Sequence, residues 1–396
     1  MDKRLIWLAV GSFTMSTVGF VFSSLLPFIA ADTHTTIPKA GYLITVFSLS
    51  YAIGAPLLSA LAGAADRRRV LTAAMLTFVA GNAIAATSVS FTTLLLAQIV
   101  MGMASGLFAA TAQATAVSLA GPEHRALAIS VVVGGTTFAV ALGAPLGALI
   151  AAVWGWRGTF GAISVLALAC ATVLWFRLPR GLSGTKLTLG ERFSIIGRAG
   201  IAPSLVVTFL YLAGGFMIIS YLAPLAIDGA GLSRLSLPGL LLAFGVGAVI
   251  GNLSSGYLAD RIGATRMVVG SLVASVAIAL AIAFGLHLLP HHLAGPLLIG
   301  IMLPWGIIGW AFPPAQASRI VGYAPEVAHL TLSLNASALY LGIAAGTALG
   351  GRVLEYAAPA DLGYVAAIFP VAALAVLYAG LRSHRRFVAT TATPAE

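Results

Sequence analysis

Long runs of apolar residues, separated by short polar connections, occupy most of this chain. A helix needs about 20 apolar residues to cross the ~30 Å hydrocarbon core of a bilayer, and each run reaches that length. The pattern therefore predicts an all-α membrane protein. The twelve expected spans are 5–30, 39–65, 70–90, 92–119, 126–153, 158–178, 201–228, 235–259, 267–289, 296–321, 328–355 and 362–381.

The composition supports this prediction and excludes other classes of protein. Of the 396 residues, 60% are hydrophobic and 8% are charged, whereas soluble domains carry about 25% charged residues. Too little polar surface is available for a soluble enzyme. A net charge of +10 indicates nucleic-acid binding only when the basic residues form a solvated face, so we expect no nucleic-acid partner. The single cysteine, Cys170, excludes an intrachain disulfide.

The basic residues indicate the orientation of the chain. With both termini in the cytoplasm, 17 of the 21 Lys and Arg residues lie in cytoplasmic connections. Positive residues are enriched in such connections. We therefore expect a multi-pass protein of a bacterial cytoplasmic (inner) membrane with both termini inside. The exceptions are Lys39, Arg157, Arg234 and Arg352.

Several features occur twice, at a nearly constant spacing. The pairs are Asp66-Arg67 with Asp260-Arg261, 194 residues apart, and Pro122-Glu123 with Pro325-Glu326, Gly143 with Gly346 and Gly147 with Gly350, each 203 residues apart. Two related bundles facing each other across a central cavity permit alternating access. We expect an N-terminal six-helix bundle (1–178), a cytoplasmic linker (179–200), a C-terminal six-helix bundle (201–382) and a cytoplasmic tail (383–396).

Six segments carry recognisable motifs: ALAGAADRRR (60–69), GAPLG (143–147), WGWRGTF (154–160), GYLADRIGATR (256–266), PPAQASR (313–319) and SLNASALYLGIAAGTALGG (333–351). With them, nearly the whole chain resembles the major facilitator superfamily, and more narrowly its drug:proton antiporter branch of arabinose-efflux-permease-like exporters. The resemblance implies the major facilitator fold, with the fifth and eleventh helices lining the cavity near the interface between the halves. Plain helix packing explains the glycines of these helices equally well. The residues of this antiporter and packing motif are Gly143, Pro145, Gly147, Gly346 and Gly350.

The repeated Asp-Arg loops are candidates for a gate. An aspartate followed by arginines at a cytoplasmic helix end can pair across the bundle and hold the inner side shut. The alternative is that these arginines only determine topology. The gating candidates are Asp66, Arg67, Arg69, Asp260, Arg261 and Arg266, with Glu123 and Glu326 as partners for the arginines.

Polar and aromatic residues inside the spans are candidates for substrate contact, because polar groups are costly in a bilayer. A mostly apolar cavity with scattered hydrogen-bonding groups suits a neutral or amphiphilic small molecule. For each residue singly, packing or hydrogen bonding between helices is an equal alternative. The favoured residues are Phe20, Gln113, Tyr221, Trp305, Gln316, Asn335 and Tyr340.

The energy source is less directly indicated by the residues than the transport class is, because no acidic residue lies at the centre of a span. The branch often carries an acid one or two residues before a phenylalanine of the first helix, where this chain has Val18 and Gly19 before Phe20. Asp32 and Asp228, near helix ends, are the candidates for proton coupling. Two other outcomes stay open: a facilitator without coupling, or a substrate that itself carries the proton.

These observations predict a secondary active transporter that exports a small drug, sugar or metabolite by alternating access, with proton antiport as the expected energy source. A facilitator or uniporter is the alternative, and an intramembrane enzyme or a scaffold is a distant third. The sequence has no HExxH, GxSxG or GxxxxGK[ST] motif. We expect no enzymatic activity, no cofactor and no metal, with the substrate, the lipid bilayer and protons as partners of a monomer.

Overall fold

The structure, a computed structural model, describes residues 2–120, 125–182, 190 and 194–391, and contains no strand in those ranges. The first long helices are α1 (Arg4–Asp32), α2 (Ile37–Leu61), α3 (Arg67–Thr87), α4 (Phe91–Leu119), α5 (Arg125–Phe138), the π-helical segment η2 (Ala139–Gly143) and α6 (Ala144–Arg177). After a 3-10 turn, η3 (Ile195–Gly197), come α8 (Ile201–Ile219), α9 (Leu222–Pro224), the π-helical η4 (Leu225–Gly229), η5 (Arg234–Ser236), α10 (Leu237–Ile262), α11 (Ala264–Leu288), α12 (His291–Tyr323), η6 (Pro325–Val327), α13 (Ala328–Tyr356) and α14 (Asp361–Thr391).

Eleven helices in the described ranges are long and apolar enough to cross a membrane, and one of them accounts for two crossings. The segment Leu127–Arg177 has 51 residues, which as one straight helix would extend about 75 Å. Within it, Gly155 has φ +70°, a left-handed conformation that favours glycine. The hydroxyl of Thr159 donates to the carbonyl of Gly147 at 3.0 Å, which is possible only if the chain reverses between them. The prediction of twelve spans is thereby confirmed.

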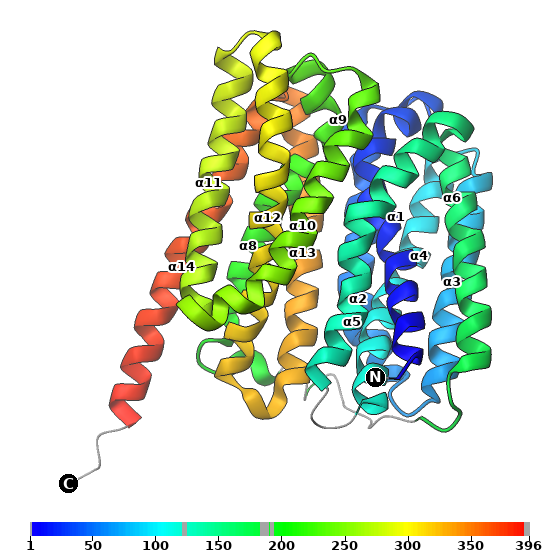
Figure 1. The fold of residues 1–396 in the computed structure, drawn as a ribbon, viewed down its shortest axis with the longest axis vertical. Helices are drawn as coiled ribbons and strands as arrows, with labels where there is room; N and C mark the ends of the chain where they lie inside the picture. Colours follow the sequence, from blue (N-terminus) through cyan, green and yellow to red (C-terminus); the bar gives the residue numbers. More distant parts are fainter. Residues whose placement is uncertain (1, 121–124, 183–189, 191–193, 392–396) are drawn as a thin grey trace.

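Figure 1 shows two groups of helices side by side. Helices α1 to α6 form the first half, and α8 to α14 form the second half. Because the chain crosses an even number of times, the N-terminal residues and the end of α14 lie on the same side of the molecule (Figure 1). We call this the terminal side, and the opposite side, where Gly155 reverses the chain, the far side.

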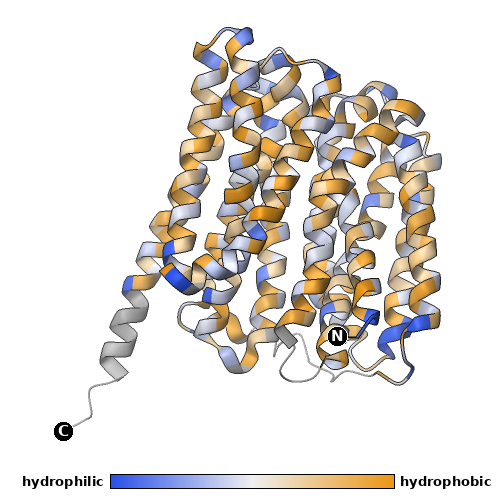
Figure 2. Ribbon diagram, in the orientation of Figure 1, coloured by the Kyte–Doolittle hydropathy of each residue, from blue (hydrophilic) through white to orange (hydrophobic). Residues whose placement is uncertain are grey.

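Large hydrophobic side chains cover the outside of the helices, as a lipid environment requires. Val165, Phe176 and Leu253 are 71%, 74% and 78% exposed, which in water would be costly. Figure 2 shows apolar residues along the full length of the helices, while the most hydrophilic residues lie near the helix ends. The outer surface therefore matches the hydrocarbon of a membrane.

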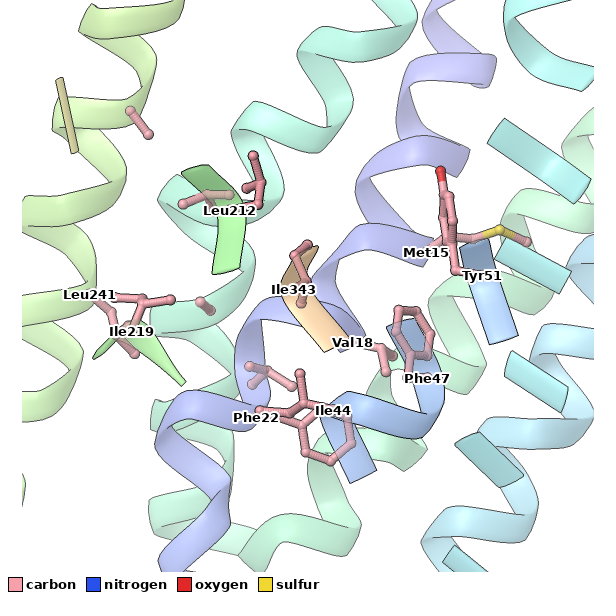
Figure 3. Close-up of a cluster of buried hydrophobic side chains, with 14 of the residues drawn as sticks. Met15, Val18, Phe22, Ile44, Phe47, Tyr51, Leu212, Ile219, Leu241 and Ile343 are labelled. Carbon is pink, nitrogen blue, oxygen red and sulfur yellow. The ribbon is translucent and has the colours of Figure 1, made fainter. Parts of the chain in front are cut away.

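One large hydrophobic cluster extends through both halves and surrounds the space between them. Figure 3 shows part of it, with Phe22 from α1, Ile44 from α2 and Ile343 from α13. Helices α2 and α13 pack together across the halves, and α10 packs against η2 and α6. The contact of α2 with α13 and the contact of α10 with η2 and α6 connect the halves on either side of the central cavity.

Within each half, glycines of the antiporter and packing motif face a helix of the same half. A Cβ added to Gly143 would meet the side chain of Thr17 on α1, and one added to Gly346 would meet the backbone of Ala213 on α8. The two contacts are equivalent in the two halves. The helices that carry these glycines also contribute to the cavity walls, through Thr136 of α5 and Tyr340 of α13.

Candidate functional site: a central cavity open toward the terminal side

A cavity of about 220 Å³ lies between the two halves. Aromatic and aliphatic side chains form most of its wall. Phe20 of α1 lies with its ring centroid 6.0 Å from that of Phe216 on α8 and 5.8 Å from that of Trp310 on α12. Such rings offer a ligand flat apolar faces and polar edges. The aromatic lining residues are Phe20, Tyr51, Tyr211, Phe216, Phe244, Trp305, Trp310 and Tyr340.

The polar groups of the cavity are few and uncharged. Ser12, Gln113, Thr136 and Ser275 line it, and no Asp, Glu, Lys, Arg or His is among its described lining residues. The hydroxyls of Thr136 and Ser16 lie 3.1 Å apart, and Ser275 donates to the Tyr211 hydroxyl at 3.4 Å. The cavity therefore provides hydrogen bonds but no counter-charge.

A second chamber of about 260 Å³, which we call the vestibule, adjoins the cavity on the terminal side. It is lined by residues of α2, α3, α4, α5 and α13, among them Arg67 and the exposed Ala114, and by the half-exposed loop residues Ala62 and Gly63. Tyr51, Ala109, Gln113 and Ala336 line both chambers. The Tyr51 ring stacks on the Tyr340 ring with centroids 3.5 Å apart, so this inter-half pair stands at the boundary between them.

The far side of the cavity is closed by tight packing between the halves. Tyr221 is fully buried, and its hydroxyl donates to the Thr347 carbonyl at 2.9 Å. A Cβ added to Gly41 of α2 would collide with that hydroxyl, which shows how closely the halves approach there. The guanidinium of Arg234 lies 5.9 Å from the ring centroid of Phe28. The structure therefore has its opening on the terminal side.

Four of the residues favoured as substrate contacts line the cavity, namely Phe20, Gln113, Trp305 and Tyr340. The other three favoured residues do not line it. Tyr221 belongs to the far-side closure, while Gln316 and Asn335 lie in a buried hydrogen-bond network of the second half. Tyr211, Phe216 and Trp310 also line the cavity. They are among the polar and aromatic residues of the spans but outside the favoured set, because nothing in the sequence pattern distinguishes them from core residues.

The buried network connects α8, α12 and α13. The Nε2 of Gln316 donates to the Ser204 carbonyl at 2.7 Å and to the Thr208 hydroxyl at 3.1 Å, while its Oε1 accepts from Nε of Arg319 at 3.0 Å. The Thr208 hydroxyl donates to Oδ1 of Asn335 at 2.7 Å. The five residues of this network, Ser204, Thr208, Gln316, Arg319 and Asn335, are all buried. The network therefore holds the three helices in one arrangement.

The first Asp-Arg loop makes its hydrogen bonds within the first half and to the start of the linker. Asp66 caps α3 by accepting from the N–H of Arg68 at 2.9 Å, and it accepts from the N–H of Gly181 at 2.8 Å. The bond from Gly181 is the main reason that the pKa of Asp66 is lowered from its ordinary value. The N–H of Arg67 donates to the Leu182 carbonyl at 2.8 Å.

The guanidinium of Arg67 also stays within its half. Its Nη1 donates to the Ala114 carbonyl at 2.6 Å and to the Ser118 hydroxyl at 2.8 Å, both on α4. Arg69 is exposed on the next turn. Within the described residues, no hydrogen bond of this loop reaches the second half, although the sequence suggested pairing across the bundle. The loop instead binds the linker that leads to the second half.

The second Asp-Arg loop and the glutamates are described in part. The guanidinium of Arg261 lies 4.4 Å from the ring centroid of Tyr257, and Arg266 is exposed. Asp260 lies in α10 and Glu326 in η6, while Glu123 falls outside the described residues. Their role in gating stays a prediction.

Neither candidate for proton coupling lies deeper than the helix ends. Asp32 is the last residue of α1, is 43% exposed and pairs with Arg157 at 2.6 Å on the far side. Arg157 also donates to the Ser88 carbonyl and lies over the Trp156 ring. Asp228 lies in η4 and is exposed.

Comparisons with known proteins agree with this architecture. A model of the family described as the Major Facilitator Superfamily matches residues 8–347. The chain is 32% identical over 361 residues to the uncharacterised MFS-type transporter YbcL of Bacillus subtilis (strain 168), covering 91% of each chain. It is 29% identical over 364 residues to the inner membrane transport protein YdhP of Escherichia coli (strain K12), covering 92% of this chain and 91% of that protein.

Solved structures share the fold at low sequence identity. The human organic anion transporter MFSD10 (TETRAN) matches with a TM-score of 0.73 and 18% identity, over 94% of this chain and 98% of that one. A bacterial homologue of the human lysosomal transporter Spinster, in an inward-facing and unoccupied conformation, matches with a TM-score of 0.70 and 16% identity, over 96% of this chain and 98% of that one.

Proposed function

The chain belongs to the Major Facilitator Superfamily and is a multi-pass membrane transporter, not an enzyme; from this premise we propose that it carries a small, uncharged, amphiphilic molecule with an aromatic part. The observation that carries the proposal is the composition of the central cavity. Its wall is apolar with eight aromatic residues, its polar groups are hydroxyls, one amide and the indole N–H groups of Trp305 and Trp310, and no charged side chain is among its described lining residues. An ionised ligand would lose its hydration there without gaining a counter-charge.

Alternating access supplies the mechanism of the proposal. The first half (1–178) would rock against the second (201–382), joined by the linker (179–200), so that the cavity opens to one side at a time. Basic residues concentrate on the terminal side, which we place in the cytoplasm. The vestibule would then receive substrate from the cytoplasm, and export would be the direction of transport. Both halves of one chain supply the cavity walls, so a monomer is sufficient.

For the energy source, the geometry supports facilitated transport down a gradient, because the described cavity wall offers no carboxylate to exchange protons. The drug:proton antiporter branch that the motifs resemble is the second candidate. The observation in its favour is the ion pair of Asp32 with Arg157, which joins the end of α1 to α6 just after the reversal at Gly155. Protonation of Asp32 would release that pair when the far side opens.

The substrate class is tested by thermal unfolding of the purified protein with a panel of uncharged aromatic amphiphiles, sugars and nucleosides. A ligand that binds the folded state raises the midpoint of unfolding. We expect stabilisation by the aromatic amphiphiles and no effect of glucose. Stabilisation by sugars alone would contradict the proposed class.

Coupling is then tested in proteoliposomes that contain an internal pH dye, with the panel compound that stabilises the protein most. Transport without proton movement would support the facilitator. Proton movement that depends on the compound and is lost in Asp32→Asn would support antiport instead. The conservative variant Asp228→Asn is the matched control, since Asp228 is also a far-side acid.

A further inference from the structure

The two halves use one repeated glutamine in different ways. Gln113 of α4 and Gln316 of α12 are 203 residues apart, the spacing of the other repeated features, and both stand in the sequence Ala-Gln-Ala followed by Thr or Ser. They therefore occupy equivalent positions in the two halves. Their surroundings show that only one of them is free to bind a ligand.

In the second half, Gln316 is fully occupied by protein groups. Its amide nitrogen donates to Ser204 and Thr208, and its amide oxygen accepts from Arg319. Arg319 is 9% exposed and lies over the Tyr323 ring, so its charge is held inside the half. The side chain of Gln316 is 0% exposed and both of its N–H donors are used, so it is out of reach of a ligand.

In the first half, two of the equivalent polar side chains are missing. Ala116 of the first half corresponds to Arg319, and Val132 corresponds to Asn335. Both lie 203 residues before their counterparts. Thr17 and Ala213, which contact the equivalent glycines Gly143 and Gly346, are 196 residues apart. At the same spacing, Ser12 of α1 corresponds to Thr208 of α8. No hydrogen bond joins Gln113 or Ser12 to another described side chain or carbonyl.

The free groups point to the cavity. Ser12, Gln113 and Val132 all line it, and Gln113 also lines the vestibule at the boundary beside Tyr51. Gln113 is half-buried and lines both chambers, so its amide is accessible to a ligand, and a hydrogen bond to the ligand would form in mainly apolar surroundings. Phe216, Trp305 and Trp310 of the second half cover the cavity with aromatic surface instead.

We propose that Gln113, assisted by Ser12, is the specificity-determining residue that binds a neutral hydroxyl, carbonyl or carboxamide group of the substrate. The aromatic part of the substrate then lies against the second half. This inference rests on the proposed function, and it adds the orientation of the substrate and the polar group that is selected. Gln316, although equivalent in sequence, is a structural residue.

The test uses two probes of nearly the same shape, 1-naphthol and 1-methylnaphthalene, which differ in a hydroxyl. Affinities are obtained from the concentration dependence of the unfolding midpoint in lipid nanodiscs. The wild-type protein should bind 1-naphthol more tightly. Gln113→Met keeps the size of the side chain and should weaken the binding of 1-naphthol about tenfold, as expected for one lost hydrogen bond of about 1.4 kcal/mol. The affinity for 1-methylnaphthalene should change less than about twofold.

Two control variants separate the possible failures. Gln316→Met should lower the unfolding midpoint of the ligand-free protein and keep the preference for 1-naphthol. Trp310→Ala should weaken the binding of both probes to the same extent. Unchanged preference in folded Gln113→Met would overturn the role of Gln113 and leave the proposed substrate class standing. If neither probe stabilises the wild-type protein, the aromatic substrate class is wrong, and this inference falls with it.

Discussion

At the scale of single residues, the informative feature is where each polar group finds its partner. In the second half, Thr208 takes part in bonds to Asn335 and Gln316 and is 1% exposed. In the first half, Gln113 faces the cavity. Inside a membrane protein, a polar group is therefore assigned to stability or to binding by its neighbours and not by its type.

Removing the Thr208 hydroxyl should destabilise the second half. Thr208→Val keeps the shape of the side chain but leaves Asn335 and Gln316 short of one partner each, which should lower the free energy of unfolding by about 1–2 kcal/mol. Unfolding in mixed micelles measures the change. Thr87→Val is the control, because Thr87 is exposed and bonds only to its own helix. An equal loss in both variants would contradict a special role of the network.

Asp66 should make the stability depend on pH. Its pKa is lowered in the folded protein, chiefly by the Gly181 N–H, so its stabilising contribution is complete above the ordinary value of about 3.9 and is lost as the pH falls below it. The difference in unfolding midpoint between the wild-type protein and Asp66→Asn should be largest near pH 7 and should shrink toward pH 3. A difference that grows at low pH would refute this account.

At the scale of helices, close approach between backbones determines the packing inside each half. α13 lies so close to α8 that a Cβ on Gly346 would meet the Ala213 backbone, and α1 lies against the segment that begins at Gly143. Small residues allow such contacts between helices in a bilayer, where burial of apolar surface supplies little net driving force. These glycines thus allow close packing of α13 on α8 in the second half and of η2 on α1 in the first half.

A large residue at Gly346 should therefore prevent packing of α13 on α8. We expect Gly346→Leu to lose most folded protein, because the obstructing atoms belong to a backbone and cannot move aside. Gly270→Leu on α11 is the matched control, since nothing lies within 4 Å of its added Cβ. Size-exclusion chromatography of both variants measures the folded fraction, and a normal yield of Gly346→Leu would rule out this packing argument.

At the scale of the whole molecule, an asymmetry between the two sides determines access to the cavity. Tyr221 and Gly41 close the far side, while the vestibule continues from Tyr51 and Gln113 to the terminal side. This is the arrangement expected of one end state of alternating access. The linker is attached to the first half near that opening, through Asp66 and Arg67.

Cysteine labelling tests the direction of the opening. In a Cys170→Ser background, Ser333→Cys in the vestibule should react with a membrane-impermeant maleimide added on the terminal side only. Asp228→Cys, exposed at η4, should react from the opposite side only. Labelling of Ser333→Cys mainly from the Asp228 side would show that the resting protein opens in the other direction.

Much of the fold was predictable from the sequence, because hydrocarbon acts on each segment independently. The spans, the internal repeat and the family resemblance follow from local hydropathy and from motifs such as 256–266. The reversal at Gly155 was also marked, by a short polar break between two apolar runs. For the site, the sequence favoured Phe20 and Trp305 but could not separate Tyr221 from the cavity residues.

The sequence by itself determined that this protein spans a membrane twelve times, is built from two related halves and carries little charge that could reach a cavity. Only the tertiary structure decided which polar residues face that cavity and on which side it opens. Gln113 and Gln316 have the same local sequence, and their difference arises from Arg319, Thr208 and Asn335 on packed neighbours. The bilayer selects segments by their own hydropathy, whereas a hydrogen bond forms only when packing brings two distant groups within about 3 Å.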